Sequence, residues 1–148
     1  MNNPIHVTVA AVIERDGRYL MVEELIDGQL VYNQPAGHLE NGESLLDAVR
    51  REVLEETTCT FTPESLLGIY RWQHPGSGDT FIRFGFLGTV GEPDSGLSLD
   101  TEIQRTLWLS PEEIAVRTEQ LRSPLVQRCI DDARRGCRHP LTLLSDLG

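Results

Sequence analysis

The stretch GHLENGESLLDAVRREVLEETTC, from Gly37 to Cys59, decides how the rest of the chain is understood. Its second half predicts an amphipathic helix, because leucine and valine side chains recur there at three- and four-residue spacing. Ser44 is a suitable N-cap, and Asp47 follows it three residues later, as the partner in a capping box does. The sequence therefore predicts a helix that begins after Ser44 and packs one apolar face on a core.

Three glutamates, Glu52, Glu55 and Glu56, crowd onto one face of this predicted helix, although the 148-residue chain already has a formal charge of −10. On an exposed helix such like-charge pairs cost about 0.2–0.5 kcal/mol each. In a partly buried cleft, two carboxylates roughly 6 Å apart repel by about 3 kcal/mol at an effective dielectric of 20. Either the face is solvated or a positive group lies beside it. Arg51 is spaced to reach Glu55 one turn later and to orient its carboxylate.

Length and composition favour one globular domain spanning residues 1–148. Hydrophobic residues make up 39% of the chain and charged residues 24%, which is ordinary for such a domain. No apolar run has the length of a membrane helix, and the N-terminus lacks the features of a signal peptide, so we expect no membrane partner and a cytoplasmic location. The acidic balance argues against nucleic-acid binding, which depends on lysine and arginine. Cys59, Cys129 and Cys137 predict neither a disulfide framework nor a zinc site.

The rest of the sequence mixes strands with few helices. A short helix is expected to open at Ser110-Pro111, and a longer one spans residues 123–136. The stretch GEPDSG at 91–96 is expected to be a loop. Too few strand–helix–strand units occur for a doubly wound parallel sheet, so we expect an α/β fold of the α+β kind, with a mixed sheet between helices. Strands are predicted at residues 5–14, 18–25, 30–37, 65–74, 80–90 and 105–110.

The spacing within the opening stretch resembles the Nudix box, which reads glycine, five residues, Glu, seven residues, then Arg-Glu-apolar-x-Glu-Glu. Gly37, Glu43 and residues 51–56 stand at those positions. The chain is therefore identified as a member of the Nudix hydrolase family, whose fold is an α/β/α sandwich. One position departs, because Thr58 stands where the family usually has a glycine in a left-handed helix cap. A β-branched residue costs roughly 1–2 kcal/mol in that conformation, so we expect this helix to end differently.

The resemblance implies a loop–helix–loop that binds Mg²⁺, or alternatively Mn²⁺, and hydrolyses a diphosphate linked to another group. This chemistry suits the residues, because hard divalent cations prefer oxygen ligands, activate water and neutralise phosphate oxygens. Glu43 is expected to brace the loop or Arg51. The implied metal ligands are Glu52, Glu55, Glu56 and the carbonyl oxygen of Gly37.

The identity of the general base stays open between Glu55 and Glu102. Glu102 lies six residues before Trp108, and this resembles a family pattern in which a glutamate lies shortly ahead of the strand that carries a tryptophan. A solvated loop carboxylate is the competing interpretation of Glu102. Arg51, which can hold Glu55, completes the implied catalytic set.

Outside the box, the segments 32–40, 71–75, 81–84 and 121–126 resemble the bacterial NudJ-type phosphatases. Members of that branch act on nucleoside tri- and diphosphates and on pyrimidine diphosphates of thiamine synthesis, and they release orthophosphate. The resemblance therefore implies a small-molecule phosphate substrate. The candidate substrate-binding residues are Asn33, Gln34, His38, Arg71 and Arg83.

Several neighbouring side chains have two interpretations. Trp72, Phe81 and Phe84 could stack a base, or they could pack in a core as strand aromatics usually do. Arg122 and Ser123 lie at a predicted helix start, which is a natural anion site, although Ser123 also suits a simple N-cap.

Two other functions remain open. The first is an ADP-ribose or ADP-sugar pyrophosphatase, suggested by the placement of Pro75 sixteen residues after Cys59, although this proline also suits a turn. The second is a Nudix-like sensor that binds a nucleotide without turnover. Loss of a box glutamate would favour a sensor, whereas all of them are present here. The sequence is compatible with a monomer and with a homodimer.

Overall fold

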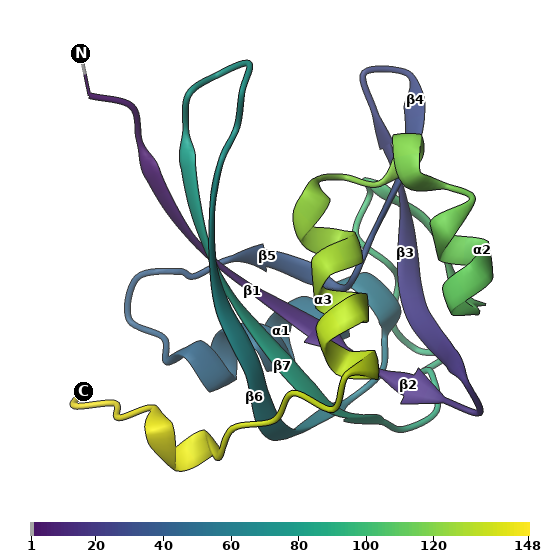
Figure 1. Ribbon diagram of the computed structural model, residues 1–148. Coiled ribbons are helices and arrows are strands. Elements are labelled where there is room, and N and C mark those ends of the chain that lie inside the picture. The colour runs from purple at the N-terminus through teal and green to yellow at the C-terminus, as the bar shows by residue number, and fades with distance from the viewer. Residues whose placement is uncertain (1) are drawn as a thin grey trace.

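The computed structural model describes residues 2–148 and contains two β-sheets (Figure 1). The first sheet has the strand order β5-β1-β7-β6. Its central strands β1 and β7 run parallel, whereas the two outer pairs are antiparallel, so the sheet is mixed, as the sequence predicts. Its strands are β1 (Ile5–Val12), β5 (Ala36–His38), β6 (Phe61–Gln73) and β7 (Thr80–Val90).

The second sheet is antiparallel and is built around β3, which pairs with each of the other three strands. The register between β3 and β8 shifts between Glu23 and Glu24, which marks an irregularity of the β-bulge type. Such irregularities re-aim side chains and are common beside functional sites. The strands are β2 (Glu14–Arg15), β3 (Arg18–Ile26), β4 (Gln29–Asn33) and β8 (Ile103–Leu109).

Helices cover both faces of the first sheet (Figure 1). Successive side chains of a strand point to opposite faces, and β7 illustrates the result: Phe86 packs in a cluster with Val53 of α1, whereas Leu87 packs in a second cluster with Ile130 of α3. The α/β/α arrangement expected from the sequence is therefore confirmed. The helices are α1 (Leu45–Thr57), α2 (Pro111–Ala115) and α3 (Pro124–Arg134), with 3₁₀ turns η1 (Thr118–Gln120) and η2 (Leu141–Leu143).

The ends of α1 are only partly as predicted. Ser44 caps its start, with Oγ accepting a hydrogen bond from the Asp47 amide at 3.1 Å. The Asp47 carboxylate lies 3.4 Å from Arg50. The expectation that the helix ends differently is wrong, because Thr58 adopts the left-handed conformation at φ 61° and its amide donates to Leu54 at 2.9 Å. The chain thus accepts the cost of a β-branched residue at this cap.

Two predicted strands are corrected. Residues 30–37 form two strands that belong to different sheets, because Pro35 cannot donate a hydrogen bond and separates β4 from β5. Strand β6 begins four residues earlier than predicted and includes Pro63, which its position at the edge of the sheet allows. The other bounds lie within about two residues of expectation, and all three cysteines are free thiols. Among residues 2–148, no helix is long and apolar enough to span a bilayer.

Candidate active site

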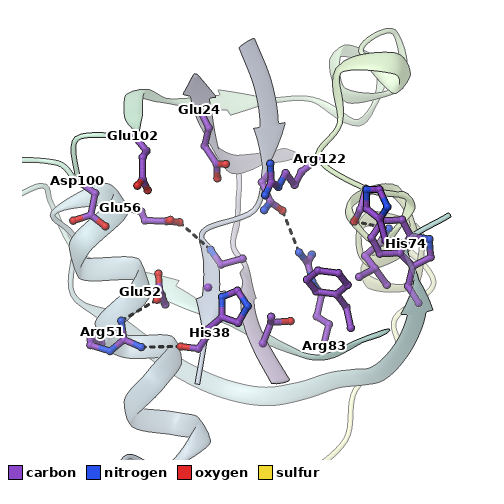
Figure 2. Close-up of a pocket in the computed structure, with 18 of the residues that line it drawn as sticks. Glu24, His38, Arg51, Glu52, Glu56, His74, Arg83, Asp100, Glu102 and Arg122 are labelled. Carbon is purple, nitrogen blue, oxygen red and sulfur yellow. Dashed lines mark hydrogen bonds and ion pairs between the residues drawn. The ribbon is translucent and has the colours of Figure 1, made fainter. Parts of the chain in front are cut away.

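A cleft of about 560 Å³ brings together residues from both sheets, α1 and the start of α3. Carboxylates gather at one end of this cleft, while Arg83 lies toward the other end with His74 (Figure 2). The lining is thus divided by charge and chemistry, which suits a ligand with a metal-binding part and a second, different part. Its defining residues are Glu24, Glu52, Glu56, Trp72, Phe81 and Arg83.

Gly37 of β5 lies directly against the carboxylate of Glu52 on α1. A Cβ atom placed on Gly37 would lie 2.2 Å from both Cδ and Oε1 of Glu52. No ordinary contact is so short, so any side chain at this position would displace the carboxylate. Glycine is therefore needed here for a close approach of backbone to a functional group.

Glu52 and Glu56 are buried carboxylates, with only 9% and 8% of each residue exposed. Glu56 Oε1 accepts a hydrogen bond from the backbone amide of Ala36 at 2.9 Å. Burial raises the pKa of Glu52 to about 7 and that of Glu56 to about 9, and neighbouring carboxylates add to both effects. Both groups are thus costly to ionise unless a cation joins them.

Arg51 is the local counter-charge for the box glutamates. Its predicted contact with Glu55 is present, and so is the bracing by Glu43. One guanidinium cannot neutralise four carboxylates, so the site retains a negative excess. Glu55 is turned toward Arg51 and is not among the residues that line the cleft. Arg51 nitrogens lie 2.7 Å from Glu43, 2.8 Å from Glu52, 2.9 Å from Glu55 and 3.2 Å from Glu40.

Glu24, Asp100 and Glu102 lie near the box glutamates at the acidic end of the cleft (Figure 2), and the Asp100 amide donates to the Glu55 carbonyl at 3.0 Å. Burial raises the pKa of Glu24 and of Asp100. Glu102 was expected to reach the site and lines the cleft, whereas the sequence analysis missed Glu24 and Asp100. The doubled glutamate at 23–24 breaks the alternation of a strand, and it could have indicated the bulge that aims Glu24 at the cleft.

Arg83 is a buried cation with neutral partners. Only 5% of it is exposed, and its Nη atoms donate to Gln34 at 2.9 Å and Asn33 at 3.3 Å. Within residues 2–148, no carboxylate pairs with it and its Nε has no hydrogen-bond partner. A desolvated guanidinium without a counter-ion favours an anionic or acceptor-rich ligand.

Two of the five candidate substrate-binding residues do not line the cleft. Gln34 is only 1% exposed, and its amide joins Arg83 to the carbonyl of Val126 at 2.9 Å, so it supports the site from below. Arg71 is exposed on the other face of β6, because its neighbours Tyr70 and Trp72 point toward α3 and the cleft. Asn33, His38 and Arg83 do line it, as expected.

The aromatic side chains divide between core and cleft. Phe84 packs in the core under α1, so it does not stack a ligand. Trp72 and Phe81 line the cleft, with ring centroids 5.7 Å apart. Arg122 and Ser123 also line the cleft, and Ser123 caps α3 by accepting a hydrogen bond from the Leu125 amide at 3.2 Å.

The donor set fits a hard divalent cation, because its side-chain ligands are carboxylate oxygens held in a partly buried cleft. In the described part of the chain, residues 2–148, no three acidic, histidine or cysteine side chains already converge as a metal-binding group. The reason lies in their present contacts, since Arg51 holds Glu52 and Glu55 while the Ala36 amide holds Glu56. The room that Gly37 leaves for the Glu52 carboxylate shows that this part of the site is built around its oxygens.

Comparisons with known proteins agree with this geometry. Residues 4–129 match the family model of the NUDIX domain. The chain is 39% identical to phosphatase NudJ of Escherichia coli strain K12 over 141 residues, which cover 95% of this chain and 91% of the relative. A solved NUDIX hydrolase from Nitrosomonas europaea is 50% identical and superposes with a TM-score of 0.93 over 97% of both chains. The MutT protein from Methanosarcina mazei Go1 shares the fold, with a TM-score of 0.73 at 24% identity over 92% and 98% of the two chains.

Proposed function

The chain belongs to the Nudix hydrolase family, and from this premise we propose that it is a Mg²⁺-dependent phosphatase of small phosphorylated molecules. The substrate is a nucleoside tri- or diphosphate, or a related pyrimidine diphosphate of the thiamine type, and orthophosphate is released. The observation that carries the proposal is the buried pair of Glu52, which lies against Gly37, and Glu56, in a cleft whose other end is aromatic and cationic. The identity to NudJ phosphatases supports the choice of substrate and product.

The residues that would hold the cation are Glu52, Glu56 and the Gly37 carbonyl. Glu55 would add a further oxygen ligand on leaving Arg51, which holds it outside the lining of the cleft. Mg²⁺ suits this set because it binds a few carboxylates and keeps its other positions for water and phosphate, and Mn²⁺ can take its place. When bound, the ion supplies positive charge to the phosphate oxygens and makes water more acidic. Arg51 fixes the orientation of Glu52 and Glu55 through its contacts at 2.8 and 2.9 Å.

Glu102 is the better candidate for the general base. It lines the cleft at the acidic end, whereas Glu55 is held by Arg51 outside the lining. A general base must reach the proton that it removes, and the position of Glu102 in the lining of the cleft supports a role in accepting a proton from a water that attacks phosphorus. Asp100 lies beside it in the same loop and adds negative charge there.

The other end of the cleft is proposed to select the group that carries the phosphates. Trp72 and Phe81 offer ring faces for a planar base. Arg83 and Asn33 offer donors and an acceptor beside those rings, and Arg122 adds an exposed positive charge at the entrance. An aromatic ring joined to a diphosphate would thus reach both ends of the cleft.

A substrate panel tests the proposal. Nucleoside tri- and diphosphates, thiamine diphosphate and ADP-ribose are incubated with Mg²⁺, with Mn²⁺ or with a chelator, and the products are identified. We expect orthophosphate from the first three, and no reaction with the chelator. AMP and ribose phosphate as the main products would favour the ADP-ribose pyrophosphatase instead, and tight nucleotide binding without turnover would favour the sensor.

Variants of the box test the assigned residues. Glu56→Gln keeps the shape of the side chain and removes its charge, so turnover should fall by roughly a thousandfold while the fold is kept. Arg71→Gln is the matched control, because this exposed side chain points away from the cleft and its loss should leave turnover unchanged. Near-normal hydrolysis by Glu56→Gln would contradict the metal-site assignment.

A further inference from the structure

Three side chains form a hydrogen-bonded chain that ends at the rim of the cleft. Asp79 Oδ2 lies 2.9 Å from His6 Nε2, and His6 Nδ1 lies 2.9 Å from His38 Nε2. Because a carboxylate accepts hydrogen bonds, His6 donates to Asp79 through Nε2. Of the three residues, His38 lines the cleft and the other two lie behind it. Neither His6 nor Asp79 has a role in the proposed metal binding or hydrolysis.

The fold holds His6 from two sides. Strands β1 and β7 run parallel in a register that places His6 opposite Phe81, and their rings stack with centroids 4.5 Å apart and planes at 10°. Asp79 stands just before β7, where its carbonyl accepts a hydrogen bond from His74 at 2.8 Å and its amide donates to Ser77 at 3.2 Å. Turning the His6 ring would therefore cost the stacking on Phe81 or the hydrogen bond to Asp79.

His38 is fixed at both its backbone and its ring. Its carbonyl oxygen accepts a hydrogen bond from Arg51 at 3.0 Å, and its Nε2 is engaged by His6. The second ring nitrogen, Nδ1, forms no hydrogen bond within residues 2–148. Figure 2 shows the His38 ring projecting into the cleft between Glu52 and Arg83, that is, between the acidic end and the cationic end.

We propose that Asp79 and His6 are positioning residues, which hold the His38 imidazole so that its Nδ1–H donates to the diphosphate of a substrate bound between Glu52 and Arg83. In this arrangement His38 Nε2 accepts from His6 Nδ1, and His6 donates from both ring nitrogens, to His38 and to Asp79. This inference rests on the proposed function of the same cleft. A lone histidine on an exposed strand end would have to be ordered when the ligand binds, whereas the chain from Asp79 has already ordered it. Preorganisation of this kind improves affinity without any new contact to the ligand.

Because Asp79 is negatively charged, its removal distinguishes a positioning role from a direct electrostatic effect on the ligand. Its carboxylate repels a phosphate, so removing that charge alone would tighten the binding of a diphosphate. If Asp79 acts by positioning, Asp79→Ala instead weakens binding, and Asp79→Asn, which keeps an acceptor oxygen for His6, retains most of the affinity. The positioning role and the electrostatic effect thus predict changes in affinity of opposite sign for Asp79→Ala.

A double-mutant cycle tests whether His6 acts through His38. His6→Phe keeps a flat ring over Phe81 and removes both hydrogen bonds, and His38→Ala removes the group that is positioned. Each should raise KM by about tenfold, as expected for one lost hydrogen bond to a charged group, and leave kcat nearly unchanged. In the His38→Ala background, His6→Phe should change KM by less than about twofold. His139→Gln is the control, because this residue is exposed and bonds through its backbone.

Binding of magnesium methylenediphosphonate, measured by calorimetry, repeats the cycle without turnover. The same pattern in Kd supports the positioning role even if no substrate of the panel is hydrolysed. The positioning role and the proposed function can therefore fail independently of each other. Equal loss of affinity from His6→Phe in both backgrounds would show that His6 acts on the fold, and would overturn the inference. Normal Kd and KM in both single variants, or tighter binding by Asp79→Ala, would overturn it as well.

Discussion

Replacing Gly37 by alanine should break the active site through a single steric contact. The new Cβ would lie 2.2 Å from Oε1 and 2.4 Å from Oε2 of Glu52, so the carboxylate must withdraw by at least about 1.2 Å to reach ordinary van der Waals contact. Overpacking of this size costs about 1–3 kcal/mol, and we expect a loss near the lower bound because the end of a glutamate can move. A displacement of roughly 1 Å at a reacting site lowers turnover by about a hundredfold.

Urea unfolding and orthophosphate release measure the two effects. In a Glu52→Ala background the clash disappears, so Gly37→Ala should then cost less than about 0.5 kcal/mol of unfolding free energy. Gly91→Ala is the matched control, because a Cβ there meets nothing within 4 Å and the backbone is not left-handed. If Gly37→Ala destabilised both backgrounds equally, or kept full activity, the close approach of Gly37 to Glu52 would not be what the site requires.

Three further predictions concern stability. Burial raises the folded-state pKa of Glu56 from 4.5 to about 9, so the folded chain keeps a proton that the unfolded chain releases. The melting temperature of the metal-free protein should therefore fall as the pH rises from about 5 to about 9. Glu56→Gln should reduce this dependence of the melting temperature on pH. Burial raises the pKa of Asp132, but the hydrogen bonds from Tyr70 and Arg128 outweigh burial, so the pKa is lowered overall. Asp132→Asn should therefore reduce the unfolding free energy in urea by about 2 kcal/mol at neutral pH. This difference should fade as the pH falls below about 4. Thr58→Gly should raise the unfolding free energy by about 1 kcal/mol, because it relieves a left-handed threonine, and an unchanged value would show that the cap is not strained.

Much of the fold and of the acidic box could be predicted because both are encoded in local patterns. Helical spacing places Glu52 and Glu56 on one side of α1, next to the valines that pack in the core, and the N-cap at Ser44 sets where that helix begins. Strands β1 and β7 of the first sheet follow from local strand patterns, and the scarcity of crossover helices indicates a mixed sheet. Patterns of this kind do not depend on distant partners.

What could not be predicted depends on contacts between distant segments. Glu24 reaches the cleft through an irregular register with β8, and the doubled glutamate at 23–24 does not reveal which distant strand pairs there. Gln34 and Arg83 are both polar, yet only their packing shows that the glutamine is buried outside the cleft lining and that the arginine lines the cleft. For Arg71, the side of the sheet depends on register shifts within β6, which a single sequence does not reveal.

The most direct test of the central claim is the affinity of the protein for Mn²⁺, measured by calorimetry on the natural chain and on the paired variant Glu52→Gln, Glu56→Gln. If these buried carboxylates hold the divalent cation, the natural chain binds Mn²⁺ and the folded variant loses that binding by at least about a hundredfold. If the variant bound Mn²⁺ as tightly as the natural chain, the cation would lie elsewhere, and the assignment of the cleft as a metal-dependent phosphatase site would be contradicted.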